Sequence, residues 1–117
     1  MIRPANADDI PRLVDLGAVM HCESPRFRDF AYQPARVASM LEWLMGSPQG
    51  LVLVADQQFE GVIGGIMAMT MPHYACELVQ ASDLAFFVHP DYRGGTAALR
   101  LVDGYRAWAH SIGAEPS

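Results

Sequence analysis

Three apolar stretches follow one another in the middle of the chain, separated only by short polar connections. They cover residues 51–55 (LVLVA), 62–71 (VIGGIMAMTM) and about 77–88 (ELVQASDLAFFV). Connections this short join strands that run in opposite directions, because parallel strands need a crossover of a dozen or more residues. The sequence therefore predicts an antiparallel sheet at the centre of the fold.

Segments with helical periodicity lie on both sides of the predicted sheet. Their apolar residues recur at helical spacing over 7–21, from Pro34 to Gly46, and from Gly95 to Gly113. Asn6 is a typical N-cap for the first segment, and Ile2–Pro4 indicates a short opening strand. The order β-α-α-β-β-β-α predicts an α+β fold with a mainly antiparallel sheet flanked by helices. We expect residues 1–117 to form a single domain.

The charge pattern argues against two classes of partner. Net charge is −5, and the eight basic residues are all arginines without a basic cluster, so we expect no nucleic-acid partner. No apolar stretch approaches the ~20 residues that cross a bilayer, so we expect no membrane partner. Cys22 and Cys76 lie far apart and lack metal-ligand spacing. We therefore expect free thiols, no metal and a cytoplasmic location, with a disulfide or a metal site as the alternative for the cysteines.

The strongest chemical signal is FFVHPDYRGGTAA, residues 86–98, where a strand leads through a turn into a long helix. A helix N-terminus leaves backbone N–H groups unpaired and carries partial positive charge, so it attracts phosphate. Gly94 and Gly95 let the backbone approach an anion, and Thr96 adds a hydroxyl donor. Arg93 either contacts a pyrophosphate or pins the turn. The pattern fits a phosphate-binding turn or a plain strand-to-helix connection.

This turn matches a family motif. GNAT N-acetyltransferases carry V-x-P-x-Y-R-G-x-G-x-[GA] between their fourth strand and third helix. The residues that match it are Val88, Pro90, Tyr92, Arg93, Gly94 and Ala98. Thr96 stands where glycine is usual. The whole chain resembles this family in the order of its elements, and its P-x-Y-R-G-x-x-A-A-L-x-L run is similar to that of short bacterial and phage members.

The resemblance implies acetyl-CoA as co-substrate and a primary amine, on a small molecule or a protein, as acceptor. It implies that the pyrophosphate is held by Arg93, Gly94, Gly95, Thr96, Ala97 and Ala98. A backbone N–H of Phe87 or Val88 would polarise the thioester carbonyl. Asp83 is the expected base and Glu77 the second candidate, a solvated strand carboxylate being the alternative for both. Strand alternation places Asp83 on the face of Ala85 and Phe87.

The resemblance also implies that part of the fold is missing. A complete GNAT domain continues into a fifth strand, a fourth helix and a closing hairpin, and we expect this C-terminally truncated chain to stop before them. Strand 77–88 would then have an exposed edge, so we expect a homodimer that covers it. The 22–32 connection, with Glu23 and Tyr32, either lines the acceptor pocket or is an irregular surface loop. The alternative function is a catalytically weak or inactive GNAT-like protein that docks onto a host or partner protein.

Overall fold

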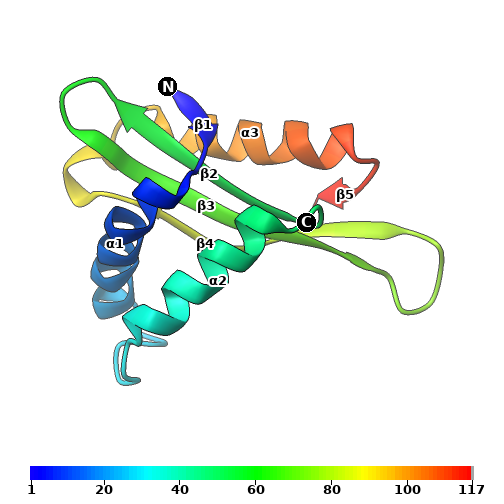
Figure 1. The fold of residues 1–117 in the computed structure, drawn as a ribbon, viewed down its shortest axis with the longest axis horizontal. Coiled ribbons are helices and arrows are strands. Elements are labelled where there is room, and N and C mark those ends of the chain that lie inside the picture. Colours follow the sequence, from blue (N-terminus) through cyan, green and yellow to red (C-terminus); the bar gives the residue numbers. More distant parts are fainter. Residues whose placement is uncertain (117) are drawn as a thin grey trace.

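The computed structural model describes residues 1–116 and shows a curved sheet with helices on both faces (Figure 1). The elements run in the order β1 (Ile2–Pro4), α1 (Ile10–Glu23), α2 (Pro34–Gly46), β2 (Gly50–Gln57), β3 (Gly61–Pro72), β4 (Val79–Val88), α3 (Ala97–Ser111) and β5 (Glu115–Pro116). Single 3₁₀ turns at Ala7–Asp9 and Pro90–Tyr92 precede α1 and follow β4. The predicted α+β fold and element order are confirmed, with one addition at the C-terminal end.

The five strands lie in the order β1-β2-β3-β4-β5. The pairs β1–β2, β2–β3 and β3–β4 are antiparallel, as the short connections predict for β2, β3 and β4. β5 is the addition, and it runs parallel to β4 and pairs with it at Gln80 and Ala81. The expectation that the chain stops before a fifth strand is therefore wrong. Within residues 1–116, the outer edge of β4 from Ser82 to Val88 has no strand partner.

A turn after α3 brings the chain back to β4. Gly113 has a φ of 72°, a left-handed conformation that favours glycine. The N–H of Ala114 donates to the carbonyl of Ala109 at 2.8 Å, and the Ala114 side chain is buried. This turn directs the next residues along the edge of β4. A strand of two residues has no periodicity of its own, so a sequence pattern does not reveal it.

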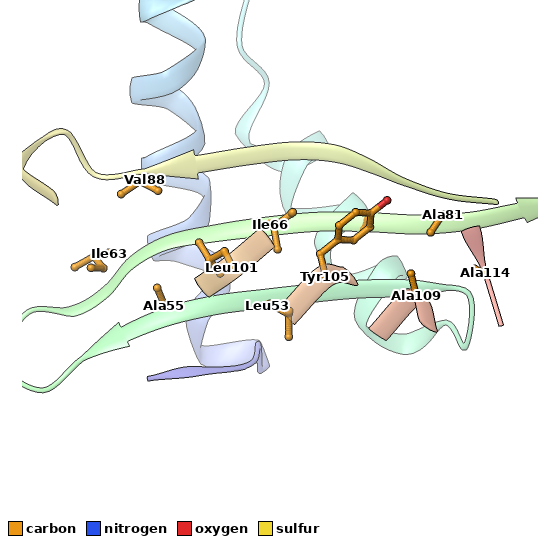
Figure 2. Packing of buried hydrophobic residues seen from close by; sticks show 11 residues of the cluster. Leu53, Ala55, Ile63, Ile66, Ala81, Val88, Leu101, Tyr105, Ala109 and Ala114 are labelled. Atoms are coloured by element: carbon orange, nitrogen blue, oxygen red, sulfur yellow. The ribbon is translucent and has the colours of Figure 1, made fainter. Parts of the chain in front are cut away.

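Helices cover both faces of the sheet (Figure 1), and an apolar layer packs on each face. In the first layer α3 covers the sheet, and Leu101 lies next to Ile66 of β3 (Figure 2). In the second, α1 and α2 contribute Leu13 and Leu41, both completely buried. A Cβ at Gly65 would lie only 2.8 Å from Leu13 Cδ2, so glycine allows α1 to approach β3 closely. The end of β4 lies between these layers.

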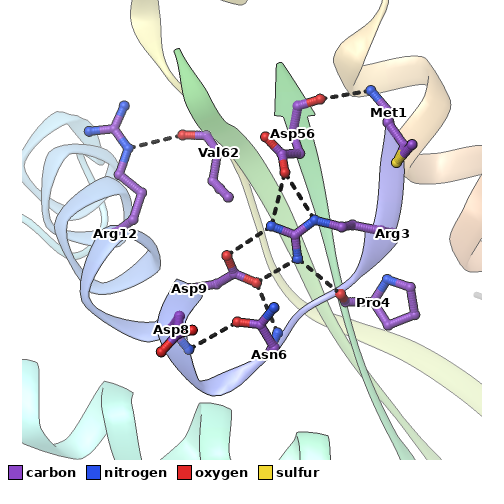
Figure 3. Close-up of polar contacts among 9 residues, drawn as sticks. All are labelled: Met1, Arg3, Pro4, Asn6, Asp8, Asp9, Arg12, Asp56 and Val62. Carbon is purple, nitrogen blue, oxygen red and sulfur yellow. Dashed lines mark hydrogen bonds and ion pairs between the residues drawn. The ribbon is translucent and has the colours of Figure 1, made fainter. Parts of the chain in front are cut away.

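A buried carboxylate ties the N-terminal segment to the sheet (Figure 3). Asp9 is 7% exposed and accepts hydrogen bonds from Arg3 Nη1 at 2.8 Å and Nη2 at 3.0 Å. It also accepts the backbone N–H of Asn6 at 2.8 Å, while the Asn6 side chain accepts that of Asp8. Arg3 Nε donates to Asp56 at the end of β2. The predicted N-cap is confirmed, but the turn that it caps is 3₁₀ rather than α-helical.

Replacing Asp9 with asparagine is expected to lower the free energy of unfolding by about 2–3 kcal/mol at pH 7, because Arg3 loses a mostly buried bidentate partner. The hydrogen bonds from Arg3, and then that from Asn6, hold the pKa of Asp9 below its ordinary value of 3.8. A carboxyl whose pKa is lowered by folding stabilises the fold above its unfolded pKa and loses that contribution as pH falls. The deficit of Asp9→Asn should therefore shrink below pH ~4.

Urea unfolding at pH 7 and pH 3 measures this difference. Asp8→Asn removes the same charge from the exposed neighbour and should change stability by less than about 0.5 kcal/mol. An equal deficit for Asp9→Asn at both pH values would contradict the role given to its ionised carboxylate.

Candidate functional site

The turn from β4 into α3 is ordered by its own hydrogen bonds. His89 donates its N–H to the carbonyl of Ile63 at 2.7 Å, which anchors the end of β4 to β3. The N–H of Tyr92 reaches His89 O at 2.9 Å, and that of Gly95 reaches Tyr92 O at 3.1 Å. His89 Nδ1 accepts the N–H of Asp91 at 3.1 Å. The start of α3 is thus held in a defined position relative to β4.

α3 begins without a cap. Thr96 is the N-cap residue, but its side chain makes no capping hydrogen bond in the part of the chain that the structure describes. Among the described residues, no acceptor pairs with the backbone N–H groups of Thr96, Ala97, Ala98 and Leu99. Four unpaired donors at the positive end of a helix of 15 residues attract an anion such as phosphate.

Gly94 and Gly95 leave the outside of this turn open. Neither has a positive φ, so the backbone conformation does not require glycine. Among residues 1–116, a Cβ at Gly94 would meet no atom within 4 Å, and a Cβ at Gly95 would lie 3.4 Å from Tyr92 O. The fold itself therefore has room for a side chain at both positions. What the glycines provide is space for a ligand to approach the backbone.

Two cavities flank the turn. The larger has a volume of about 400 Å³ and lies between the end of α1 and the end of β4. Its lining includes Met20, Glu23, Phe87, Val88, Arg93 and Ala98. The smaller has a volume of about 260 Å³, lies toward β1 and β2, and is lined in part by Gly95, Thr96, Ala97 and Arg100. The larger volume falls within the roughly 300–1,000 Å³ typical of small-molecule sites.

The predicted coenzyme-binding residues divide between these cavities. The larger cavity is lined by Phe87, Val88, Arg93 and Ala98, and the smaller cavity is lined by Gly95, Thr96 and Ala97. Gly94 lies in the turn between them and lines neither. The two carboxylates predicted as base, Asp83 and Glu77, also line neither.

Of the two backbone donors considered for the thioester, Val88 faces the open edge of β4. Val88 lies opposite Gly64, and the next residue, His89, donates its N–H to β3. In an antiparallel pair this pattern belongs to a position whose own N–H and C=O point away from the partner strand. Accordingly, Val88 O accepts a hydrogen bond from Arg93 Nε at 3.1 Å. The N–H of Val88, rather than that of Phe87, is therefore accessible from the outer edge.

Arg93 is engaged within the protein. Its Nη1 donates to Glu23 Oε2 at 3.0 Å and its Nη2 to Glu23 Oε1 at 2.5 Å. With Nε on Val88 O, Arg93 joins the end of α1, the end of β4 and the turn. The hydrogen bond from Arg93 lowers the pKa of Glu23 and raises that of Arg93 itself. Arg93 was expected either to contact a pyrophosphate or to pin the turn. In this structure its side chain pins the turn.

A bulge in β4 overturns the predicted orientation of Asp83. Ala85 pairs with Met67 but Asp83 pairs with Ala68, so Leu84 has no partner on β3. Ala68 packs in the layer under α3, whereas Ala85 and Met67 pack in the layer under α1 and α2. Asp83 therefore lies on the α3 face, and the expectation that it shares a face with Ala85 is wrong. Its side chain is exposed and makes no hydrogen bond or ion pair with residues 1–116.

Glu77 lies outside the strand on which it was expected. β4 begins at Val79, and Glu77 belongs to the exposed connection from β3. The N–H of His73 donates to Leu78 O at 2.8 Å and closes this connection before the strand starts. Because the ten residues of β4 span roughly 33 Å, Glu77 is at the far end of the strand from α3's start.

The connection between α1 and α2 is held against α1 rather than loose. Tyr32 donates its hydroxyl to Val14 O at 2.7 Å, and the ring nitrogen Nε2 of His21 lies 2.7 Å from Phe30 O. Burial raises the pKa of Tyr32. Glu23, at the start of this connection, is the residue that reaches the larger cavity. Nothing in the local pattern around Glu23 indicates that its partner lies 70 positions away.

Within residues 1–116 no group of histidine, cysteine, aspartate and glutamate side chains is arranged to hold a metal ion. Cys22 and Cys76 are free thiols on the surface. None of the described helices has the length and apolar character needed to cross a membrane.

The sequence matches no family model, and no curated protein has significant sequence similarity to it. Solved structures are similar in fold. An acetyltransferase from Vibrio fischeri matches 98% of this chain and 90% of its own length, with a TM-score of 0.72 and 19% identity. An aminoglycoside acetyltransferase from an uncultured soil metagenomic sample matches 99% of this chain and 73% of its own length, with a TM-score of 0.70 and 15% identity. A ribosomal-protein-alanine N-acetyltransferase from Brucella melitensis biovar Abortus 2308 matches 99% of this chain and 75% of its own length, with a TM-score of 0.69 and 17% identity.

These similarities show that the chain has the GNAT acetyltransferase fold. They cover nearly all of this chain, including the β4–α3 turn on which the resemblance in sequence rests. At identities of 15–19% they establish the arrangement of elements, and the chemistry has to be argued from the residues of the site.

Proposed function

We propose that this protein transfers an acetyl group from acetyl-CoA to a primary amine of a small molecule or a protein. The observation that carries the proposal is the uncapped start of α3, open at Gly94 and Gly95 and flanked by the larger cavity at the end of β4. Unpaired donors at a helix N-terminus suit the pyrophosphate of CoA. The cavity beside them suits the pantetheine arm, because its β4 wall is apolar.

The N–H of Val88 is our candidate for the donor that polarises the thioester carbonyl. It points to the outer edge of β4, next to the same cavity. A donor aimed at the oxygen where negative charge develops stabilises the tetrahedral intermediate of acyl transfer. The amine nitrogen attacks the carbonyl carbon, the C–N bond forms, the C–S bond breaks, and CoA leaves as a thiolate that takes up a proton.

Asp83 remains our candidate for the base that removes the proton from the acceptor amine. It is an exposed carboxylate on the far side of the bulge from the Val88 end of β4. Because it lines neither cavity, it would act through water rather than by direct contact. The acceptors named for the similar structures, an aminoglycoside and a ribosomal-protein alanine, differ so much that we leave the acceptor as a primary amine. Exposed free thiols suit the cytoplasmic location that we propose.

A second candidate is a GNAT-like protein without efficient catalysis that acts by docking onto a partner protein. The observations that favour it are that Asp83 lines neither cavity and that Arg93 is paired with Glu23. A homodimer also remains a proposal, because the edge of β4 from Ser82 to Val88 offers unpaired backbone groups to a second copy.

Titration with acetyl-CoA by calorimetry separates these candidates. The acetyltransferase proposal predicts one site per chain with a dissociation constant of micromolar order. Absence of heat and of saturation at millimolar acetyl-CoA would leave only the docking candidate.

A further inference from the structure

Glu23 is hydrogen-bonded to Arg93, the arginine that the turn motif assigns to phosphate binding. The two carboxylate oxygens of Glu23 meet Arg93 Nη1 and Nη2 at 3.0 and 2.5 Å, which is a bidentate contact. A phosphate group engages a guanidinium in the same forked geometry. Glu23 therefore presents to Arg93 the contact that a phosphate of a bound ligand would make.

The pair also decides the charge of the larger cavity. Among the described residues that line it, Glu23 and Arg93 are the only charged ones, and the rest of the wall is apolar apart from Ser24. Paired with Glu23, the Arg93 cation is neutralised, so an approaching anion is attracted mainly by the start of α3. Without the carboxylate, the same cavity would hold an uncompensated positive charge.

We propose that Glu23 competes with the phosphates of CoA for Arg93 and thereby sets the affinity for the co-substrate. The inference rests on the proposed function. On binding, Nη1 and Nη2 of Arg93 pass from Glu23 to a phosphate, while Nε keeps its contact with Val88 O. Glu23 acts through Arg93, so it is a positioning residue and not a catalytic one.

The exchange is energetically modest. The side chains of Glu23 and Arg93 are each 46% exposed, and exposed ion pairs contribute little to stability. CoA can therefore displace the carboxylate without disrupting the fold. For the same reason, removing the competitor should improve CoA binding by a small factor rather than by orders of magnitude.

The test compares the parent protein, Glu23→Gln and Glu42→Gln by calorimetry. Glu42 lies exposed on α2 and makes no ion pair within residues 1–116, so its substitution removes the same charge without touching the cavity. Each protein is titrated with CoA and, separately, with pantetheine, which lacks phosphate. Glu23→Gln should bind CoA about three- to fivefold more tightly than the parent, with pantetheine unchanged and Glu42→Gln like the parent.

Unchanged or weaker CoA binding by Glu23→Gln would overturn the inference while leaving the proposed function intact. An equal change for CoA and pantetheine would overturn it as well, since a change without phosphate dependence means that Glu23 only shapes the cavity. Failure of all three proteins to bind CoA would instead reject the proposed function, and this inference with it.

Discussion

Replacing Gly95 with leucine is expected to abolish CoA binding while the protein stays folded. A leucine there would project over the unpaired N–H groups at the start of α3 and exclude a phosphate from them. The fold has room for the change, because a Cβ at Gly95 meets nothing closer than Tyr92 O at 3.4 Å and the φ is not positive. We expect the affinity for CoA to fall by at least about 100-fold and the unfolding free energy to change by less than about 0.5 kcal/mol.

The matched control is Gly46→Leu. Gly46 ends α2, is exposed, and has no atom within 4 Å of a Cβ placed on it. This variant should bind CoA like the parent and unfold at nearly the same denaturant concentration. CoA binding by Gly95→Leu at the parent's affinity would mean that the phosphates bind elsewhere.

The second large effect is expected on turnover. If Asp83 removes the proton of the acceptor amine, Asp83→Asn should lower kcat by roughly 100-fold or more. CoA affinity should stay the same, because Asp83 lines neither cavity at the turn. Acetyl transfer, followed as release of the CoA thiol across a range of pH, measures both the rate and its pH dependence.

Two further variants make this result interpretable. Asp103→Asn removes an exposed carboxylate from α3 and should leave kcat unchanged. Glu77→Gln tests the second candidate, which the structure places in the connection before β4. If Asp83→Asn turns over at the parent's rate with the same pH profile, Asp83 is not the base; a fall for Glu77→Gln alone would transfer the role to that residue.

Local periodicity and capping residues were sufficient to predict most of the fold. The apolar spacing over α1, α2 and α3 is strong, and Pro34 and Gly113 mark a helix start and a helix end by their backbone preferences. The connections between β2, β3 and β4 are too short for the crossover that parallel strands need, so these strands pair antiparallel. The position of the turn between β4 and α3 was predictable for the same reason, since all of its residues are contiguous, and phosphate binding there stays a prediction.

Features that depend on contacts between distant segments were not predictable. The bulge at Leu84 arises from how β4 pairs with β3, and it reverses the face of Asp83 without any sign in the alternation of β4 itself. β5 exists because Gly113 and Ala114 direct two residues onto the edge of β4. The Glu23–Arg93 pair joins residues 70 positions apart, and the sequence alone places Glu23 in the 22–32 connection and Arg93 in the turn before α3.

We propose that the start of α3 binds the phosphates of CoA, and NMR signals of the backbone amides, followed during a CoA titration, locate the site residue by residue. We expect the largest saturable shifts on the N–H groups of Thr96, Ala97, Ala98 and Leu99, with a further shift at Val88. The backbone amide signals of α2, such as those of Glu42 and Gly46, should not shift. Saturable CoA binding that leaves the α3 amide signals unchanged would show that the phosphates bind elsewhere.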